Sequence, residues 1–381
     1  MPPIKIAVNT RLLLPHRMEG IGYFTFETLR HIVQQQPQVE FHFLFDRPFD
    51  PSFVFAPNVK PIVLFPPARH PFLWYWWFDW SVKSYLAKHD FDLFLSPDGY
   101  LPLGITTPTV AVQHDIAFVH YPHSIDWLTS KYYHYFVPKF LHQATRIATV
   151  SEYSKADLIK HYHIAPQKID VVYSAAKEVF RPVTDAVKTE MRNSYTQGKP
   201  YLLYVGSINA RKNLQTMLLG FDKYKDEQGG DLQFLIAGAM GWQNSDLQPV
   251  LDTMKHRADV IFLGRQSLHE LVRLVGGAFA LMYVSLFEGF GVPPLEAMAC
   301  AVPVISSTAS SLPEVCGSAA ILVPPTDVQA LAHAITQLCS NPALYHSLTQ
   351  QGLAQAQLFT WQRTATLLWK SCERAIQNYI G

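Results

Sequence analysis

The 381-residue sequence lacks the features that mark membrane, nucleic-acid-binding or disulfide-stabilised proteins. It has four cysteines, and none of them forms the Cys-x-x-Cys pairs typical of metal or redox sites. Its 31 basic and 30 acidic residues give a net charge of +1, without the basic excess of nucleic-acid-binding proteins. No apolar run is long enough for a transmembrane helix, and the N-terminal one is too short for a signal peptide. We therefore expect a cytoplasmic protein that binds no nucleic acid.

The sequence is 49% hydrophobic and 16% charged, which is enough for a large buried core. Short β-rich segments alternate with longer amphipathic ones, and the alternation starts again near residue 201. Runs of Val, Ile and Leu between helices are typical of parallel sheets covered on both faces. The sequence thus predicts an α/β protein with two doubly wound, Rossmann-like domains facing across a cleft, with ligands at the carboxyl ends of the strands. The predicted strands are 4–9, 40–46, 92–96, 109–113, 146–150, 168–174, 201–207, 232–238, 260–264, 279–285, 302–307 and 319–325.

The domain boundaries are predicted from this alternation. Residues 1–177 form the first domain and residues 199–357 the second. The polar, turn-rich segment 178–198 is interpreted as the connection between them. Residues 358–381 have the apolar spacing of a long final helix, which we expect to return towards the N-terminal domain.

The segment SLFEGFGVPPLEAMACAVPVI places two carboxylates, Glu288 and Glu296, among apolar, Gly and Pro residues. The Gly and Pro residues of GFGVPP exclude a helix there, so Glu288 lies in a loop after a strand. Pro293 and Pro294 suit the first turn of the next helix, which places Glu296 two or three residues into it. A strand, a Gly loop and a helix N-terminus form an anion site, where acids could bind sugar or ribose hydroxyls. Taken singly, Glu296 could instead complement the helix dipole and Glu288 could be a surface acid.

Three other loops contain candidate site residues. Arg211 and Lys212 follow the first strand of the second half, where they could neutralise a diphosphate or form a solvated loop tip. Gly20 and Gly22 precede a helix predicted from residue 23, and they would allow the backbone to approach a ligand. Their spacing does not match a dinucleotide fingerprint. His114 follows another predicted strand, at the expected cleft.

Two features have more than one interpretation. Asp90 and Asp92 form an Asp-x-Asp pair of the type that holds a metal on a nucleotide sugar, but they precede a strand. That position is at the sheet end opposite the cleft, so no metal site is expected. The aromatic segment HPFLWYWWFDWSVKSYL (70–86) is either a buried amphipathic helix or a surface that meets lipid or a lipid-linked acceptor.

Six segments together resemble a known family: EGIGYF, QHDIAFVHYP, RIATVSEYSKADL, YVGSINARKNL, SLFEGFGVPPLEAMA and SSLPEV. The chain resembles the retaining glycosyltransferases of family 4, which have the GT-B architecture, over nearly its whole length. The resemblance implies transfer of a hexose from a nucleotide-diphosphate sugar, GDP- or UDP-linked, to a saccharide or lipid-linked acceptor. It also implies retained anomeric configuration and no metal or other cofactor. The RKN segment is similar to that of mannosyltransferases of surface polysaccharide assembly, which favours mannose and allows peripheral contact with the inner face of the membrane.

The resemblance also implies roles for the second-half residues. Arg211 and Lys212 match a diphosphate clamp, and Glu296 matches the group that accepts hydrogen bonds from the ribose hydroxyls. Glu288 matches a contact to the donor sugar or its diphosphate. The second domain would therefore bind the nucleotide sugar, and the first would lie on the acceptor side.

Five further residues receive roles from the same resemblance. The backbone N–H groups around Phe290 and Gly291 would bind sugar hydroxyls and phosphate oxygens. Gly20 and Gly22 match a loop beside the diphosphate, and His114 matches a histidine near the transferred sugar. Two alternatives stay open: a nucleotide-sugar epimerase or hydrolase on the same fold, and a non-catalytic protein that binds sugar nucleotides.

Overall fold

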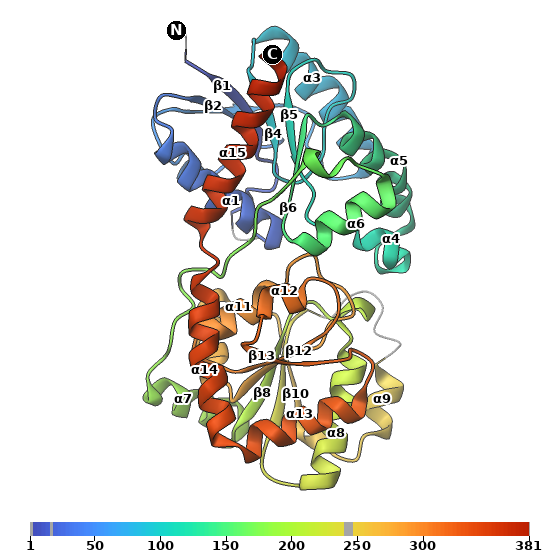
Figure 1. The fold of residues 1–381 in the computed structure, drawn as a ribbon, viewed down its shortest axis with the longest axis vertical. Coiled ribbons are helices and arrows are strands. Elements are labelled where there is room, and N and C mark those ends of the chain that lie inside the picture. Colours follow the sequence, from blue (N-terminus) through green and yellow to red (C-terminus); the bar gives the residue numbers. More distant parts are fainter. Residues whose placement is uncertain (1–2, 16–17, 240–246, 381) are drawn as a thin grey trace. The chain divides into compact units, whose positions relative to one another are not determined.

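The computed structural model describes residues 3–15, 18–239 and 247–380, which form two compact units. The first unit comprises Met1–Ser174 together with Trp361–Gly381, and the second comprises Ala175–Thr360. Each unit has a parallel β-sheet with helices packed against it (Figure 1). The prediction of two doubly wound α/β domains is confirmed.

The sheet of the first unit has seven parallel strands in the order β3-β2-β1-β4-β5-β6-β7. Strands β4, β5 and β6 are buried along their whole length, as expected for central strands covered on both faces. The edge strand β3 was not predicted, because Pro61 and Lys60 interrupt its apolar pattern; an edge strand tolerates proline. The strands are β1 (Lys5–Asn9), β2 (Glu40–Phe45), β3 (Val59–Val63), β4 (Leu93–Ser96), β5 (Thr109–Val112), β6 (Arg146–Thr149) and β7 (Ile169–Val171).

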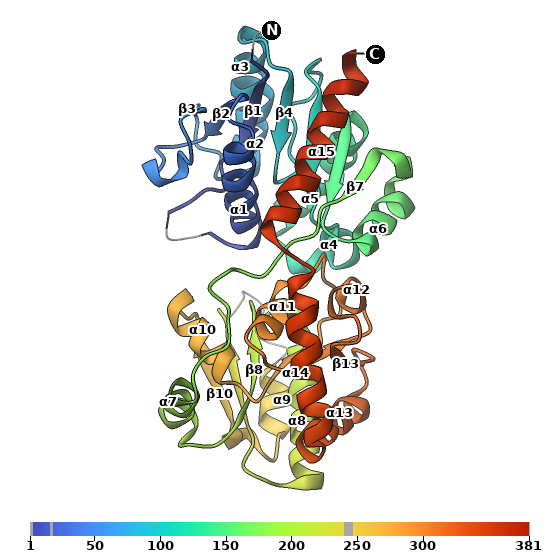
Figure 2. The same ribbon diagram turned by 60° about the vertical axis from the view of Figure 1, so that its left-hand side comes forward.

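The helices of the first unit include the last helix of the chain, α15, which packs on α1 and on strands β4 to β7 (Figures 1 and 2). Thr364 anchors it by donating a hydrogen bond to the carbonyl oxygen of Tyr173 at 2.6 Å. The α-helices are α1 (Gly20–Gln35), α2 (Pro71–Trp76), α3 (Lys83–Lys88), α4 (Ala117–His120), α5 (Trp127–Gln143), α6 (Glu152–Tyr162) and α15 (Trp361–Ile380). Short 3-10 turns η1 (Pro51–Phe53), η3 (Pro122–Ser124) and η4 (Pro166–Lys168) connect them, and η2 (Trp77–Val82) is a π-helix.

The aromatic segment runs through α2, η2 and α3, and it has one buried face and one exposed face. Trp77 and Phe78 are fully buried, and Trp77 donates a hydrogen bond to the carbonyl oxygen of Leu64 at 2.9 Å. On the other face Trp76 and Trp80 are 55% and 66% exposed. In the described part of the chain, no helix combines the length and apolarity that crossing a membrane requires.

The sheet of the second unit has six parallel strands in the order β10-β9-β8-β11-β12-β13. The segment interpreted as a connection, 178–198, contains helix α7, which packs on α10 within this unit. The strands are β8 (Tyr201–Val205), β9 (Gln233–Ala237), β10 (Val260–Gly264), β11 (Ala280–Tyr283), β12 (Val304–Ser307) and β13 (Ala320–Val323). The helices are α7 (Asp185–Thr196), η5 (Ala210–Lys212), α8 (Leu214–Gln228), α9 (Gln248–Thr253), η7 (Arg257–Asp259), α10 (Leu268–Gly277), α11 (Val292–Ala299), α12 (Leu312–Cys316), α13 (Val328–Ser340) and α14 (Pro342–Gln357).

Both sheets have a topological switch point, where strand order changes direction. It lies between β1 and β4 in the first sheet and between β8 and β11 in the second. In doubly wound sheets, ligands bind outside the carboxyl ends of the strands at this point. The loops after β8 and β11 contain Arg211, Lys212 and Glu288, so these residues lie where a ligand of the second unit is expected.

Candidate functional site

The loop after β8 is held in one conformation by asparagine side chains. Asn209 caps η5 by accepting a hydrogen bond from the backbone N–H of Lys212 at 3.3 Å. Asn213, in the left-handed conformation at φ 58°, donates to the carbonyl oxygens of Val284 at 2.9 Å and Pro325 at 2.5 Å. These bonds tie the loop to the end of β11, so Lys212 is presented beside the loop that follows β11.

The loop after β11 is fixed by two serines of the SSLPEV segment. The N–H of Glu288 donates to Ser310 Oγ at 2.8 Å, and Ser311 Oγ donates to the carbonyl oxygens of Glu288 at 2.9 Å and Phe290 at 2.8 Å. Gly291 has φ 98°, and a Cβ atom there would lie 2.6 Å from Leu312 Cδ2. Glycine is therefore required at the turn into α11.

Glu288 lies at the centre of four side chains that we call the Glu288 cluster: Arg211, Lys212, Tyr283 and Glu288. Lys212 Nζ lies 2.6 Å from Glu288 Oε1, and Arg211 Nη1 lies 3.1 Å from Glu288 Oε2. Lys212 also donates to the Tyr283 hydroxyl at 2.7 Å, which in turn donates to Glu288 Oε1 at 2.9 Å. The structure thus brings together three of the predicted residues and adds Tyr283, which sequence analysis missed.

The charges of the Glu288 cluster leave an excess of one positive charge, from two cations and one carboxylate. Burial alone would raise the pKa of Glu288, but the positive charges of Lys212 and Arg211 outweigh it and hold the pKa at about 2. Burial, followed by the charge of Glu288, raises the pKa of Tyr283 well above its usual value, so the phenol stays protonated. Two cations beside one carboxylate are suited to binding an anion.

Glu296 is a buried partner of Lys177 rather than a first-turn acid. It is the fifth residue of α11, which begins at Val292 and has no acidic residue in its first turn. The placement two or three residues into the helix was wrong, because Val292 and the two prolines already form the first turn. Glu296 is 3% exposed, and its Oε1 lies 2.7 Å from Lys177 Nζ. Sequence analysis missed Lys177, which is 119 residues away along the chain.

His114 follows β5 and is held as a neutral imidazole. Its Nε2 lies 2.9 Å from the carbonyl oxygen of Pro97, so Nε2 carries the hydrogen and Nδ1 is an acceptor. The ring packs edge-on against Phe24, with 4.8 Å between centroids. Burial lowers the pKa of His114, so the ring stays uncharged at neutral pH.

Gly20 and Gly22 lie inside the first turn of α1, which begins at Gly20 rather than at Tyr23 as predicted. The two glycines have different environments. A Cβ atom at Gly22 would lie 2.8 Å from the carbonyl oxygen of Leu12, so close packing explains this glycine. A Cβ atom at Gly20 would meet nothing within 4 Å. Close approach to a ligand stays a prediction for both glycines, and packing against Leu12 is a second reason for glycine at position 22.

The first unit also has an ion pair at its switch point. Arg11, after β1, lies 2.6 Å from Asp98, after β4, and its guanidinium stacks 4.2 Å from the Tyr100 ring centroid. This pair could not be predicted, because the pairing of β1 with β4 is not visible in the local sequence. Asp92 accepts a hydrogen bond from the N–H of Lys5 at 2.8 Å, so it braces the opposite end of the sheet.

Comparison with protein families matches both halves of the chain. Residues 18–176 match the model described as Glycosyltransferase Family 4, and residues 187–355 match Glycosyl transferases group 1. The chain is 28% identical to O-antigen chain mannosyltransferase B of Escherichia coli, over 75% of this chain and 74% of that protein. It is 27% identical to O-antigen chain mannosyltransferase RfbU of Salmonella typhimurium, over 76% of this chain and 77% of that protein.

Solved structures show the same fold. Sucrose-phosphate synthase from Thermosynechococcus elongatus superposes with a TM-score of 0.76 at 21% identity, over 96% of this chain and 98% of that chain.

Proposed function

This chain belongs to the glycosyltransferases, with a family 4 domain followed by a group 1 domain, and on that premise we propose that it transfers a hexose from a nucleotide-diphosphate sugar. The proposed acceptor is a saccharide or a lipid-linked saccharide in surface polysaccharide assembly. Mannose is the proposed hexose, because two O-antigen mannosyltransferases match three quarters of the chain. The proposed mechanism rests on the Glu288 cluster, which places two cations beside each other.

We propose that Arg211 and Lys212 bind the diphosphate of the donor. When the bond between the sugar and the diphosphate breaks, negative charge grows on the leaving oxygen. Cations that are already in place stabilise that charge more in the transition state than in the ground state. Glu288 has both carboxylate oxygens engaged by the cations, so it acts as a positioning residue that keeps Lys212 and Arg211 at the end of β8.

Glu296 is proposed to accept hydrogen bonds from the ribose hydroxyls of the donor. Its contact with Lys177 holds the carboxylate in a fixed position. The backbone N–H groups of Phe290 and Gly291 lie at the entry to α11, where they are suited to phosphate oxygens or sugar hydroxyls. In the first unit, Gly20, Gly22 and neutral His114 stay proposed substrate contacts.

We propose that the reaction retains the anomeric configuration and needs no metal ion. The acceptor oxygen attacks the anomeric carbon on the face from which the diphosphate leaves. The new carbon–oxygen bond forms as the bond to the diphosphate breaks, and a phosphate oxygen takes the acceptor proton. Arg211 and Lys212 supply the positive charge that a metal would otherwise supply.

The exposed side of α2 and η2 is proposed to contact a membrane surface or the lipid part of the acceptor. We call it the aromatic face: Phe65, Phe72, Tyr75, Trp76 and Trp80, each more than half exposed. The hydroxyl of Ser81 donates to the carbonyl oxygen of Phe65 and holds this residue beside η2. Clustered exposed Trp, Tyr and Phe are typical of surfaces that insert between lipid headgroups.

The experiment that tests the function is a panel of GDP- and UDP-linked sugars, with nucleotide release measured with and without a saccharide acceptor. A transferase releases nucleotide when the acceptor is added. An epimerase or hydrolase would consume donor equally well without it, and a non-catalytic protein would bind a donor and release nothing.

A further inference from the structure

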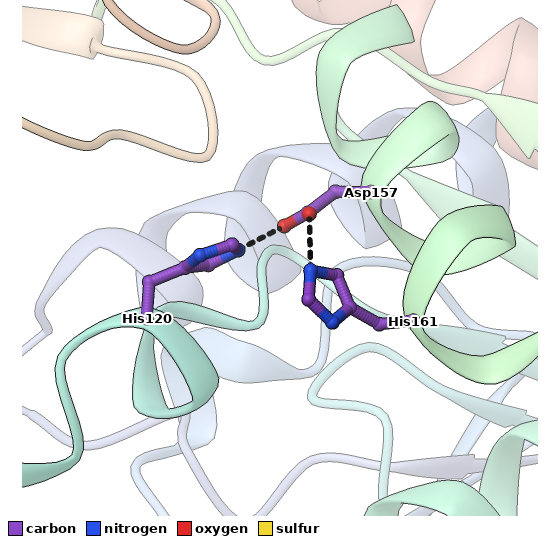
Figure 3. Close-up of side chains that lie close together, drawn as sticks. All are labelled: His120, Asp157 and His161. Atoms are coloured by element: carbon purple, nitrogen blue, oxygen red, sulfur yellow. Dashed lines mark hydrogen bonds and ion pairs between the residues drawn. The ribbon is translucent and has the colours of Figure 1, made fainter.

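Another group of polar side chains lies in the first unit: His120, Asp157 and His161. His120 ends α4, and Asp157 and His161 lie one turn apart on α6. Both imidazoles face the carboxylate (Figure 3). His120 Nε2 is 2.8 Å from Asp157 Oδ2, and His161 Nε2 is 3.3 Å from Asp157 Oδ1.

The Asp157 carboxylate has no permanent counter-charge in the described residues 3–15, 18–239 and 247–380. Its side chain is 7% exposed, and its ion-pair partners there are the two histidines, which are charged only when protonated. A buried carboxylate is costly unless a cation or several hydrogen bonds compensate its charge. The two imidazole side chains are 28% and 29% exposed, so an ion can reach the group from solvent.

We propose that His120, Asp157 and His161 bind a divalent transition-metal ion, with Zn²⁺ as the best-fitting member of that class. Their ligand atoms all lie within 4.8 Å of one another, so small side-chain rotations bring them to one ion. Two imidazole nitrogens and one carboxylate oxygen suit Zn²⁺, whereas Mg²⁺ and Ca²⁺ prefer oxygen ligands. The ion would replace the two N···O contacts, with each neutral imidazole carrying its hydrogen on Nδ1 and with water as the fourth ligand of the tetrahedral site.

The bound ion would act as a structural clamp. It would join α6 to the connection that runs from β5 through His114 to α4. This connection already contacts α6, because Ser154 Oγ donates to the carbonyl oxygen of His114 at 3.3 Å. The clamp involves neither Arg211 nor Lys212, so it is separate from the proposed metal-free chemistry of the second unit.

The test is a titration of the metal-stripped full-length chain with Zn²⁺ and with Co²⁺, whose visible spectrum reports its coordination. Wild type is expected to bind one ion per chain and to melt at a higher temperature when Zn²⁺ is present. His120→Ala and His161→Ala are expected to bind at least about ten-fold more weakly and to lose the Zn²⁺-dependent rise in Tm. The matched control is His123→Ala, which removes an exposed histidine in η3 and should bind as wild type does.

The outcomes separate the metal site from a plain hydrogen-bonded group. Equal Zn²⁺ affinity in wild type and His161→Ala, or no saturable one-to-one binding by wild type, overturns the proposal. The proposal is also overturned if His161→Ala lowers the Tm, relative to wild type, by the same amount with and without Zn²⁺. If Asp157→Asn fails to fold, the two histidine variants still decide the question, because their side chains are partly exposed.

Discussion

Glu288→Gln and Glu296→Gln are expected to damage the protein in different ways, although both remove one buried charge with little change in shape. Glu288 holds Lys212 and Arg211, the proposed diphosphate ligands, whereas Glu296 is the proposed ribose ligand. Loss of Glu288 should therefore lower kcat, because the cations lose the group that orients them. Loss of Glu296 should mainly raise the KM for the donor, because a ribose contact is equally strong in the ground and transition states.

The size of each effect follows from the structure. Lys212 and Arg211 hold the pKa of Glu288 at about 2, so the charged carboxylate stabilises the folded state; removing one partner of a buried ion pair costs about 3–5 kcal/mol. Glu288→Gln should lose stability of this order. For Glu296→Gln, loss of charge-assisted hydrogen bonds costs about 1.5–3 kcal/mol, or roughly 10- to 150-fold in donor affinity.

The assay is steady-state kinetics with varied donor, combined with urea unfolding of each variant. Glu190→Gln is a matched control, because its pair with Arg273 lies at the surface with the Glu190 side chain 56% exposed. That variant should lose less than about 1 kcal/mol and keep wild-type kinetics. Equal effects of the two buried variants on kcat and KM would refute the division of roles. So would a Glu288→Gln enzyme with wild-type stability and kcat.

Three further outcomes are expected. Turnover should persist in excess EDTA; activity lost in chelator and restored by Mn²⁺ or Mg²⁺ would contradict metal-free chemistry. Trp76→Ser with Trp80→Ser should weaken liposome binding or raise the acceptor KM without unfolding, whereas Trp77→Ser should cost about 3–5 kcal/mol because that ring is core. Because the pKa of Glu288 is depressed, the stability that its carboxylate gives to the folded state should be complete above pH 4.5 and lost as the pH falls towards 2. Melts of wild type and Glu288→Gln should therefore converge in acid.

Local sequence was sufficient for the features that depend on neighbouring residues. The Gly and Pro residues of GFGVPP predicted both the loop that carries Glu288 and the helix after it, and the structure confirms both. Trp77 and Trp80 were harder to place. The segment is helical throughout, but which face is buried depends on where the sheet lies.

Pairs between distant residues could not be predicted from the sequence. Lys177 and Glu296 meet because the chain after β7 packs beside α11, and Arg11 meets Asp98 because β1 pairs with β4. Arg211, Lys212 and Glu288 were each predicted as site residues, yet their ion pairs were not, since these follow from the pairing of β8 with β11. For the Glu288 cluster, the sequence indicated three of the four side chains, and the sheet order determined how they pair.

The central claim is that Lys212 and Arg211 promote departure of a nucleotide diphosphate from a sugar donor. The most direct test compares acceptor-dependent nucleotide release by wild type and by Lys212→Gln with the best donor of the panel. We expect release that requires the acceptor in wild type and a kcat about 100-fold lower in the folded variant, as for removal of one group that stabilises developing negative charge. Release at the same rate without acceptor, or wild-type kcat in Lys212→Gln, would contradict it.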